Sequence, residues 1–223
     1  MATISSNTIV KNGMPFIGKV LRQIAPLVDE LIITISEKSN DGTIKEVSRV
    51  YEDFSGKILV DFENVSHPGE LTKVEQAQVD KSKGDWILFL SDDDYWPTEE
   101  LKKCLEELDK DKDVLAYDVS PYQLINEFQH DTRWRGHKWF SKLLRREGLR
   151  YIKDWPEELP ADKNNEPLYW RTHSQVKHLP YYFYHLALLK SYSFRTEQWM
   201  QPHNSNKSYR DPYPGDLPHK IFL

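Results

Sequence analysis

Cysteine is almost missing from this chain of 223 residues, whose single thiol is Cys104. One cysteine excludes an intramolecular disulfide framework and an all-cysteine zinc site, and it suits a reducing compartment. Long apolar runs are missing as well, since no window approaches the roughly 18 to 20 apolar residues of a membrane span. The first residues also lack the basic start and apolar run of a secretory signal. We therefore expect a cytoplasmic protein without a transmembrane segment.

Several catalytic motifs are also absent. The chain has no Gly-x-x-x-x-Gly-Lys loop, no His-Glu-x-x-His and no Gly-x-Ser-x-Gly, so the common signatures of phosphate-binding loops, zinc proteases and serine hydrolases are excluded. The formal net charge of -5 gives no overall attraction to nucleic acid or to an anionic membrane. Hydrophobic residues at 39% and aromatic residues at 13% indicate a folded globule.

The first half of the chain alternates two kinds of segment. Short apolar or β-branched runs predict strands, and apolar residues at steps of three and four predict helices. The expected strands cover residues 3–10, 30–36, 57–62 and 85–90, and the expected helices cover 16–28, 70–84 and 98–111. This alternation predicts an α/β fold with a mostly parallel central sheet flanked by helices.

The regular pattern fades beyond Asp118. Aromatic residues, prolines and histidines become dense, and only residues 137–148 keep a helical stripe, formed by Trp139, Phe140, Leu143 and Leu144. We expect one domain with two parts: an α/β region at 1–118, and an irregular, helical C-terminal lobe at 119–223 that ends in an extended tail.

Three aspartates follow the most apolar expected strand, in the stretch "WILFLSDDDYWP" that begins at Trp86. In open α/β sheets ligands bind beyond the carboxyl ends of the strands, which is where Asp92, Asp93 and Asp94 should lie. Adjacent carboxylates repel one another unless a cation intervenes, and Mg²⁺ or Mn²⁺ prefers oxygen ligands. The alternative is a solvated turn in which an aspartate caps the next helix. An EF-hand calcium loop fits poorly, because its glycine and spaced oxygen ligands are missing.

The order of motifs resembles the family 2 glycosyltransferases of the GT-A fold. The motifs are "VKN" at 10–12, "VDELIITISEKSNDGT" at 28–43 and "GDWILFLSDDDYW" at 84–96, so the resemblance covers roughly residues 3–118. It implies a metal-dependent, inverting enzyme that transfers a sugar from a nucleotide donor, expected to be a UDP-sugar, to an acceptor hydroxyl. It also implies that 1–118 binds the nucleotide sugar and that 119–223 forms the acceptor or lid lobe.

The resemblance implies several donor-binding residues. The first strand of such enzymes ends beside the nucleotide, and the second ends in an acidic residue that hydrogen-bonds the base or ribose. A further helix passes the nucleotide, and the metal motif meets the donor through its diphosphate. The matching positions are Val10, Lys11, Asn12, Glu37, Asp41, Gln76 and Asp92.

The family's Asp-x-Asp motif binds a divalent ion, Mn²⁺ or Mg²⁺, through the diphosphate of the donor. Two registers are possible here: Ser91 and Asp93 without a gap, or Asp92 and Asp94 after a shift of one residue. Asp93 is the strongest metal candidate, because it is the ligand in one register and lies inside the triplet in the other. The family also suggests a late histidine as a further ligand, for which His185 is favoured over a buried structural role. His173 and His178 are weaker candidates.

The second half should supply the catalytic base and the acceptor site. Asp154, Glu157 and Glu158 match the acidic segment that carries the base in related enzymes, although they also fit the polar start of a helix after Pro156. The acceptor is expected to be a saccharide. The segment 133–150, which runs from Arg133 to Arg150, is rich in arginine, lysine and tryptophan, so it suits a nucleic-acid acceptor or the solvated face of a helix. The sequence leaves the oligomeric state open.

Two other functions remain possible. A nucleotidyltransferase would need a glycine-rich, basic phosphate loop after the first strand, and "VKNGMPFIGK" matches that pattern poorly. A sugar-nucleotide or divalent-ion binding module without catalysis is the other alternative. The serine at position 91, where the family often has its first aspartate, keeps this alternative open.

Overall fold

The computed structural model describes residues 2–65, 71–126, 129–131, 141–152, 159–169, 172–186 and 211–212. All four strands expected in the first half are present, as β1 (Ile4–Val10), β2 (Glu30–Ser36), β3 (Ile58–Glu63) and β4 (Trp86–Phe89). The expected helices are α1 (Ile17–Ile24), which is continued by the 3-10 turn η1 (Ala25–Leu27), α3 (Leu71–Lys81) and α4 (Thr98–Glu107). Among the described residues, no helix has the length and apolar character needed to cross a bilayer.

The helix α2 (Thr43–Asp53) was not expected from the sequence. It begins directly after Gly42, whose φ of 96° lies in the left-handed region that glycine adopts without strain. Only Thr43, Val47 and Val50 are buried along its length, so its apolar stripe is narrow and is diluted by charged residues. Such a helix is stabilised by packing against its neighbours, here mainly α1, more than by its own sequence pattern.

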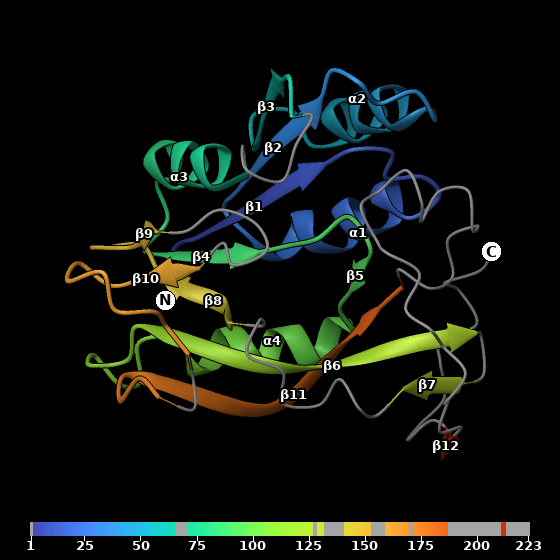
Figure 1. Cartoon of the computed structure of the whole chain (residues 1–223). Helices are drawn as coiled ribbons and strands as arrows, with labels where there is room; N and C mark the ends of the chain where they lie inside the picture. Colours follow the sequence, from blue (N-terminus) through green and yellow to red (C-terminus); the bar gives the residue numbers. More distant parts are fainter. Residues whose placement is uncertain are drawn as a thin grey trace.

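A ten-stranded mixed sheet runs through the molecule (Figure 1). Strands β3, β2, β1 and β4 lie side by side and are parallel, as predicted for the first half. Beyond β4 the sheet continues with β8 (Ser141–Arg145), β6 (Ala116–Asn126), β7 (Gln129–Asp131) and β12 (Asp211–Pro212), all in antiparallel pairings. The long β11 (Val176–His185) runs parallel to β6 and also pairs with β5 (Asp94–Tyr95). A separate small sheet joins β9 (Arg150–Tyr151) to β10 (Pro160–Ala161).

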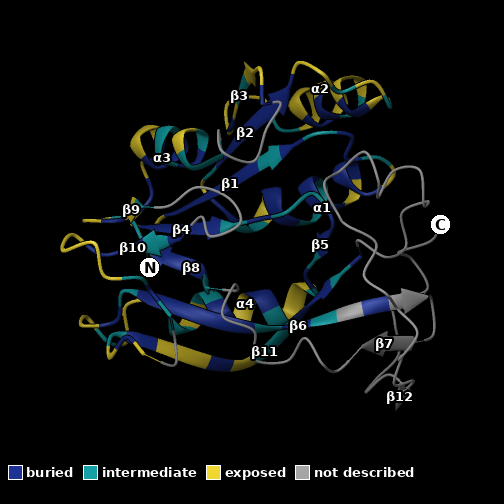
Figure 2. Ribbon diagram, viewed as in Figure 1, coloured by how far each residue is buried: buried dark blue, intermediate teal, exposed yellow. Residues whose placement is uncertain are grey.

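Helices cover both faces of the sheet. Along β4, Trp86 and Leu88 belong to the core that also holds buried residues of α1, α2 and α4, whereas Ile87 belongs to a second core with Val79 of α3. Successive strand residues point to opposite faces, so α3 lies on the face away from the other helices. The central strands are buried and the outer faces of the helices are exposed (Figure 2). The α/β class is therefore confirmed.

The prediction of a helix over residues 137–148 is wrong for the part of this range that the structure describes. Residues 141–145 form β8, in which Leu143 and Leu144 are both buried but belong to different cores, one on each face of the sheet. A strand covered on both faces reads as a continuous apolar run, which resembles part of a helical stripe. In the described part of the C-terminal lobe the regular elements are strands rather than helices. The proposed boundary after Asp118 falls inside β6, so the two parts share one sheet, and the division stays a prediction.

Trp96 ties the segment after the three aspartates to β11. Its indole is fully buried and stacks on Phe183 with ring centroids 4.8 Å apart, and no hydrogen-bond acceptor for its Nε1 is found among the described residues. We expect Trp96→Ala to lower the free energy of unfolding by about 3–5 kcal/mol. Trp96→Phe should cost clearly less, because phenylalanine keeps the ring contact and removes the unpaired N–H. Urea unfolding followed by circular dichroism measures both; equal costs for the two variants would contradict this account.

Candidate active site

The loops after β1, β2 and β4 meet at the carboxyl edge of the parallel strands. Asn12 has a left-handed backbone with φ of 55°, and its side-chain Oδ1 accepts a hydrogen bond of 2.9 Å from the Asn40 N–H. The Gly13 N–H donates to Thr43 Oγ1 at 2.7 Å. These contacts join the β1 loop to the β2 loop, so the first two nucleotide-binding segments predicted from sequence lie together.

Asp41 is the brace between these two loops. Its Oδ1 accepts hydrogen bonds from the Thr43 N–H at 3.0 Å and the Thr43 hydroxyl at 2.6 Å. Its Oδ2 accepts from the Met14 N–H at 2.9 Å. The carboxylate therefore holds the two loops together, and its contact with the donor stays a prediction, as does that of the exposed Glu37 directly after β2.

Asp92 reaches the β1 loop from the other side. A Cβ atom built on Gly13 would lie 2.9 Å from Asp92 Oδ2 and 2.5 Å from Val10 Cγ2. A side chain at position 13 would force Val10 or the Asp92 carboxylate to shift, so glycine suits this close approach. The geometry places the first aspartate of the triplet against the loop that holds Val10, Lys11 and Asn12.

Asp94 is the most deeply buried of the three aspartates. Its side chain is 0% exposed, and its Oδ2 lies 2.7 Å from Lys142 Nζ. The same oxygen accepts a hydrogen bond of 3.0 Å from the Ser91 N–H. On the other side, His185 Nδ1 lies 2.9 Å from Asp94 Oδ1 and 3.4 Å from Asp93 Oδ1. The pairing of β5 with β11 creates this contact, because it sets His185 opposite Asp94.

The charges of this cluster shift the pKa values of two of its members. Burial alone would raise the pKa of the Asp94 carboxyl, but the Lys142 ammonium and the hydrogen bond from His185 outweigh burial and hold that pKa below its usual range. Burial would likewise lower the pKa of His185, but the charges of Asp93 and Asp94 outweigh it and raise that pKa above 6.5. The cluster thus combines buried negative and positive charge.

Comparison with known proteins shows the family of this chain. The family model described as Glycosyl transferase family 2 matches residues 9–194. The chain belongs to glycosyl transferase family 2. This family match confirms the resemblance predicted from the three motifs and extends it well beyond residue 118. No curated protein matches the chain.

Solved structures show the same fold. S. aureus TarS 1-349 matches with a TM-score of 0.58 and 17% identity, over 83% of this chain and 60% of that chain. Its complex with UDP-GlcNAc matches with a TM-score of 0.58 and 16% identity, over 82% and 58%. Its complex with UDP matches with a TM-score of 0.57 and 17% identity, over 82% and 60%. The GT-A fold is confirmed, and this family 2 chain spans less than two thirds of the TarS chain length.

The donor set at the carboxyl edge fits the divalent ion expected for a family 2 enzyme. The ligand atoms of Asp93, Asp94 and His185 all lie within 4.8 Å of one another, and Asp92 adjoins them in sequence. Carboxylate oxygens with one imidazole nitrogen suit Mn²⁺ or Mg²⁺. Because His185 directs Nδ1 toward two carboxylates, any ring lone pair that it offers to an ion is that of Nε2.

Other predicted residues lie elsewhere. Gln76 of α3 donates from Nε2 to Asp80 Oδ1 at 2.9 Å and accepts from the Tyr151 N–H at 3.0 Å, so it serves the contact between α3 and β9. The weaker metal candidate His178 places Nδ1 2.8 Å from Asp118 Oδ2, apart from the aspartate triplet. The predicted catalytic acids Asp154, Glu157 and Glu158 lie outside the described residues.

Where the structure describes the basic segment 133–150, three of its four cations make contacts inside the protein and Arg150 is exposed. Lys142 is buried against Asp94, and the Arg145 guanidinium donates to the Val114 carbonyl at 2.9 Å while stacking 4.5 Å from the Trp86 ring. Arg146 donates to the Gly84 carbonyl at 2.6 Å. Sequence reasoning missed Lys142 as a site residue, because the helical interpretation of this segment put its cations in solvent. The sequence signal that could have indicated a buried lysine is its position directly before Leu143 and Leu144, two apolar residues that fit a strand covered on both faces.

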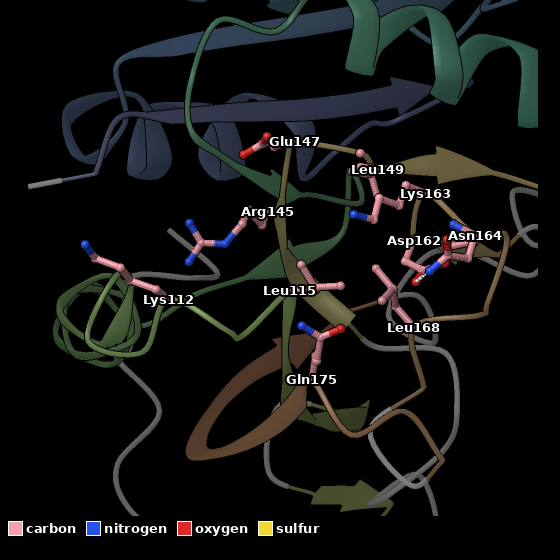
Figure 3. Close-up of a pocket in the computed structure, with 12 residues that line it drawn as sticks. Lys112, Leu115, Arg145, Glu147, Leu149, Asp162, Lys163, Asn164, Leu168 and Gln175 are labelled. Atoms are coloured by element: carbon pink, nitrogen blue, oxygen red, sulfur yellow. Dashed lines mark hydrogen bonds between the residues drawn. The ribbon is translucent and has the colours of Figure 1, made fainter.

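A cavity of about 330 Å³ lies near the start of β4, away from the edge that carries the three aspartates (Figure 3). Its walls include Arg145, which pairs with Trp86 at the start of β4, whereas the three aspartates follow the end of β4. Next to this cavity, His173 Nε2 lies 3.9 Å from Asp162 Oδ2 and 4.0 Å from Glu166 Oε2. The Gln175 N–H donates to His173 Nδ1 at 3.2 Å, so the neutral ring carries its proton on Nε2. That nitrogen then has no lone pair for an ion, which disfavours a metal at this second cluster.

The raised pKa of His185 predicts a stability that depends on pH. The folded state binds this proton more tightly than the unfolded state, so the contribution is fully present below the ordinary value of 6.5 and is lost as pH rises through the raised pKa. With EDTA present, the Tm of the parent should fall between about pH 6 and pH 8 by more than that of His185→Asn. Differential scanning fluorimetry measures this. An equal fall in His185→Asn would contradict the prediction.

Removal of the Asp41 carboxylate should lower the free energy of unfolding more than removal of the Glu37 carboxylate. Asp41→Ala leaves the Met14 and Thr43 donors without their acceptor and should lower the free energy of unfolding by about 1–3 kcal/mol. Glu37→Ala removes an exposed carboxylate and should change it by less than about 0.5 kcal/mol. Urea denaturation midpoints of the two variants and the parent decide the matter, and an unchanged midpoint for Asp41→Ala would show that the brace contributes nothing.

Proposed function

We propose that the chain is a metal-dependent, inverting glycosyltransferase that moves a sugar from a UDP-sugar to an acceptor hydroxyl. The observation that carries this proposal is the acidic cluster at the carboxyl edge of a sheet whose chain matches family 2 over residues 9–194. The edge holds both a candidate ion site and the loops after β1 and β2. A diphosphate donor needs both, because a cation must offset the charge of its leaving group.

The donor side of the site is proposed from three loops. Val10, Lys11 and Asn12 lie at the end of β1, directly before the Gly13 that Asp92 approaches, while Glu37 is exposed at the end of β2. An exposed acid at this position suits hydrogen bonds to ribose or base hydroxyl and N–H groups. UDP as the nucleotide is supported by the TarS structures, which were solved with UDP and with UDP-GlcNAc.

The proposed reaction is a direct displacement. The acceptor oxygen forms a bond to the anomeric carbon while the bond from that carbon to the diphosphate oxygen breaks, which inverts the configuration. Held by the acidic cluster that follows β4, Mn²⁺ or Mg²⁺ would act as a Lewis acid for the departing diphosphate. The acceptor hydroxyl proton passes to a carboxylate, for which Asp154, Glu157 and Glu158 remain the candidates.

A saccharide is the preferred acceptor. The nucleic-acid alternative rested on the basic segment 133–150. Of its four described cations, Lys142, Arg145 and Arg146 make contacts inside the protein, and only Arg150 is exposed. A binding surface for a polyanion needs several exposed cations along one face. A cytoplasmic location and the division into donor and acceptor parts at residue 118 stay predictions.

Titration calorimetry with UDP, in Mn²⁺ and in EDTA, tests the proposal. UDP should bind with Mn²⁺ and at least about tenfold more weakly in EDTA. Asp93→Asn should lose the Mn²⁺ dependence, because it removes a ligand, while its Tm should stay near that of the parent. Asp113→Asn removes an exposed aspartate away from the site and is the matched control. UDP binding that is absent or indifferent to metal in the parent would refute the proposal.

A further inference from the structure

Lys142 is an unusual residue for the interior of an acidic metal site. Its side chain is 5% exposed, and Nζ lies 2.7 Å from Asp94 Oδ2 and 3.5 Å from Ser91 Oγ. The ammonium also lies 5.3 Å from the ring centroids of Phe89 and of Phe183. Lysine is almost never buried without a partner, and both the carboxylate and the aromatic faces stabilise its charge. The cation is therefore built into the cluster.

The contacts of Asp94 leave little capacity for a second cation. Oδ2 accepts from the Lys142 ammonium and from the Ser91 N–H, and Oδ1 faces His185 Nδ1 at 2.9 Å. By distance alone Asp94 can join Asp93 and His185 around an ion. A divalent ion on Asp94 would, however, sit beside a buried ammonium, and repulsion between two cations is large where water is excluded.

We propose that Lys142 is a positioning residue that decides which aspartates hold the metal. Its ammonium is the counter-ion of Asp94, so Asp94 braces the loop and orients His185, and the divalent ion is held through Asp93 rather than Asp94. This inference rests on the proposed function, because it concerns the ion of the donor site. It also bears on the question of register that the triplet raises, because it disfavours the register that pairs Asp92 with Asp94.

Removal of the lysine should turn Asp94 into a metal ligand. In Lys142→Gln the buried carboxylate loses its counter-ion, and a divalent ion is then the cation that can replace it. We expect Lys142→Gln to bind Mn²⁺ about tenfold more tightly than the parent in the absence of UDP. The double variant Lys142→Gln with Asp94→Asn removes both charges and keeps a neutral hydrogen-bonding pair, so its Mn²⁺ affinity should return to within about threefold of the parent.

Free Mn²⁺ measured by electron paramagnetic resonance gives these affinities. Asp93→Asn should bind Mn²⁺ at least about tenfold more weakly than the parent. Lys177→Gln breaks the exposed ion pair with Asp111 and is the matched control for loss of a lysine, which should leave the affinity unchanged. Circular dichroism checks that each variant is folded. If Lys142→Gln alone is unfolded without ions, Mn²⁺ should refold it, because the ion then replaces the missing counter-ion of Asp94. The double variant still tests the role of Asp94.

Two results would overturn this inference and leave the proposed function standing. One is a double variant whose affinity for Mn²⁺ falls as far as that of Asp93→Asn, which would make Asp94 a ligand. The other is a folded Lys142→Gln variant with the parent's affinity, which would make the lysine a packing residue only. A parent that binds UDP without any dependence on Mn²⁺ is a different failure, since it would refute the proposed function and remove the ion whose position is at issue.

Discussion

The ion pair between Asp94 and Lys142 is the contact on which the acidic edge depends. Three consecutive carboxylates follow a buried strand, and a fully buried carboxylate is costly unless a positive partner and hydrogen bonds compensate it. Lys142 Nζ at 2.7 Å, the Ser91 N–H and His185 supply that compensation. Because the third aspartate can be buried, the loop turns into β5, and Trp96 two residues later enters the core.

The partners of this loop come from distant parts of the chain. Lys142 lies on β8, which is inserted in the sheet between β4 and β6, and His185 ends β11, which runs along β6 before it reaches β5. The second half of the chain therefore supplies the cation and the histidine of an edge whose aspartates belong to the first half. Residues 1–118 alone would leave Asp94 buried without its counter-ion, so any division into donor and acceptor parts is functional rather than structural.

Much of the first half was predictable because its periodicity is strong. The β-branched run of β2 and the apolar stripe of α1 each allow one structure, and their order gave the α/β class. The strand β8 was not predictable, because a lysine beside two leucines fits a helical face as well as a strand buried on both sides. The roles of Lys142 and Asp41 depend on partners that are remote in sequence, and no local pattern encodes such contacts.

The three aspartates are chemically identical, yet the fold gives each a different environment. Asp94 is enclosed by internal donors, Asp93 is 6% exposed and near His185, and Asp92 approaches the β1 loop where Gly13 leaves room for its Oδ2. These environments are set before any ligand binds, by the pairing of β5 with β11 and by a glycine that has no side chain to obstruct the carboxylate. Fixed orientation of charged groups avoids reorganisation when charge develops on a leaving group, which is where electrostatic catalysis gains most. A run of three aspartates therefore works as one brace and two ligand candidates, and the buried lysine is what makes them differ.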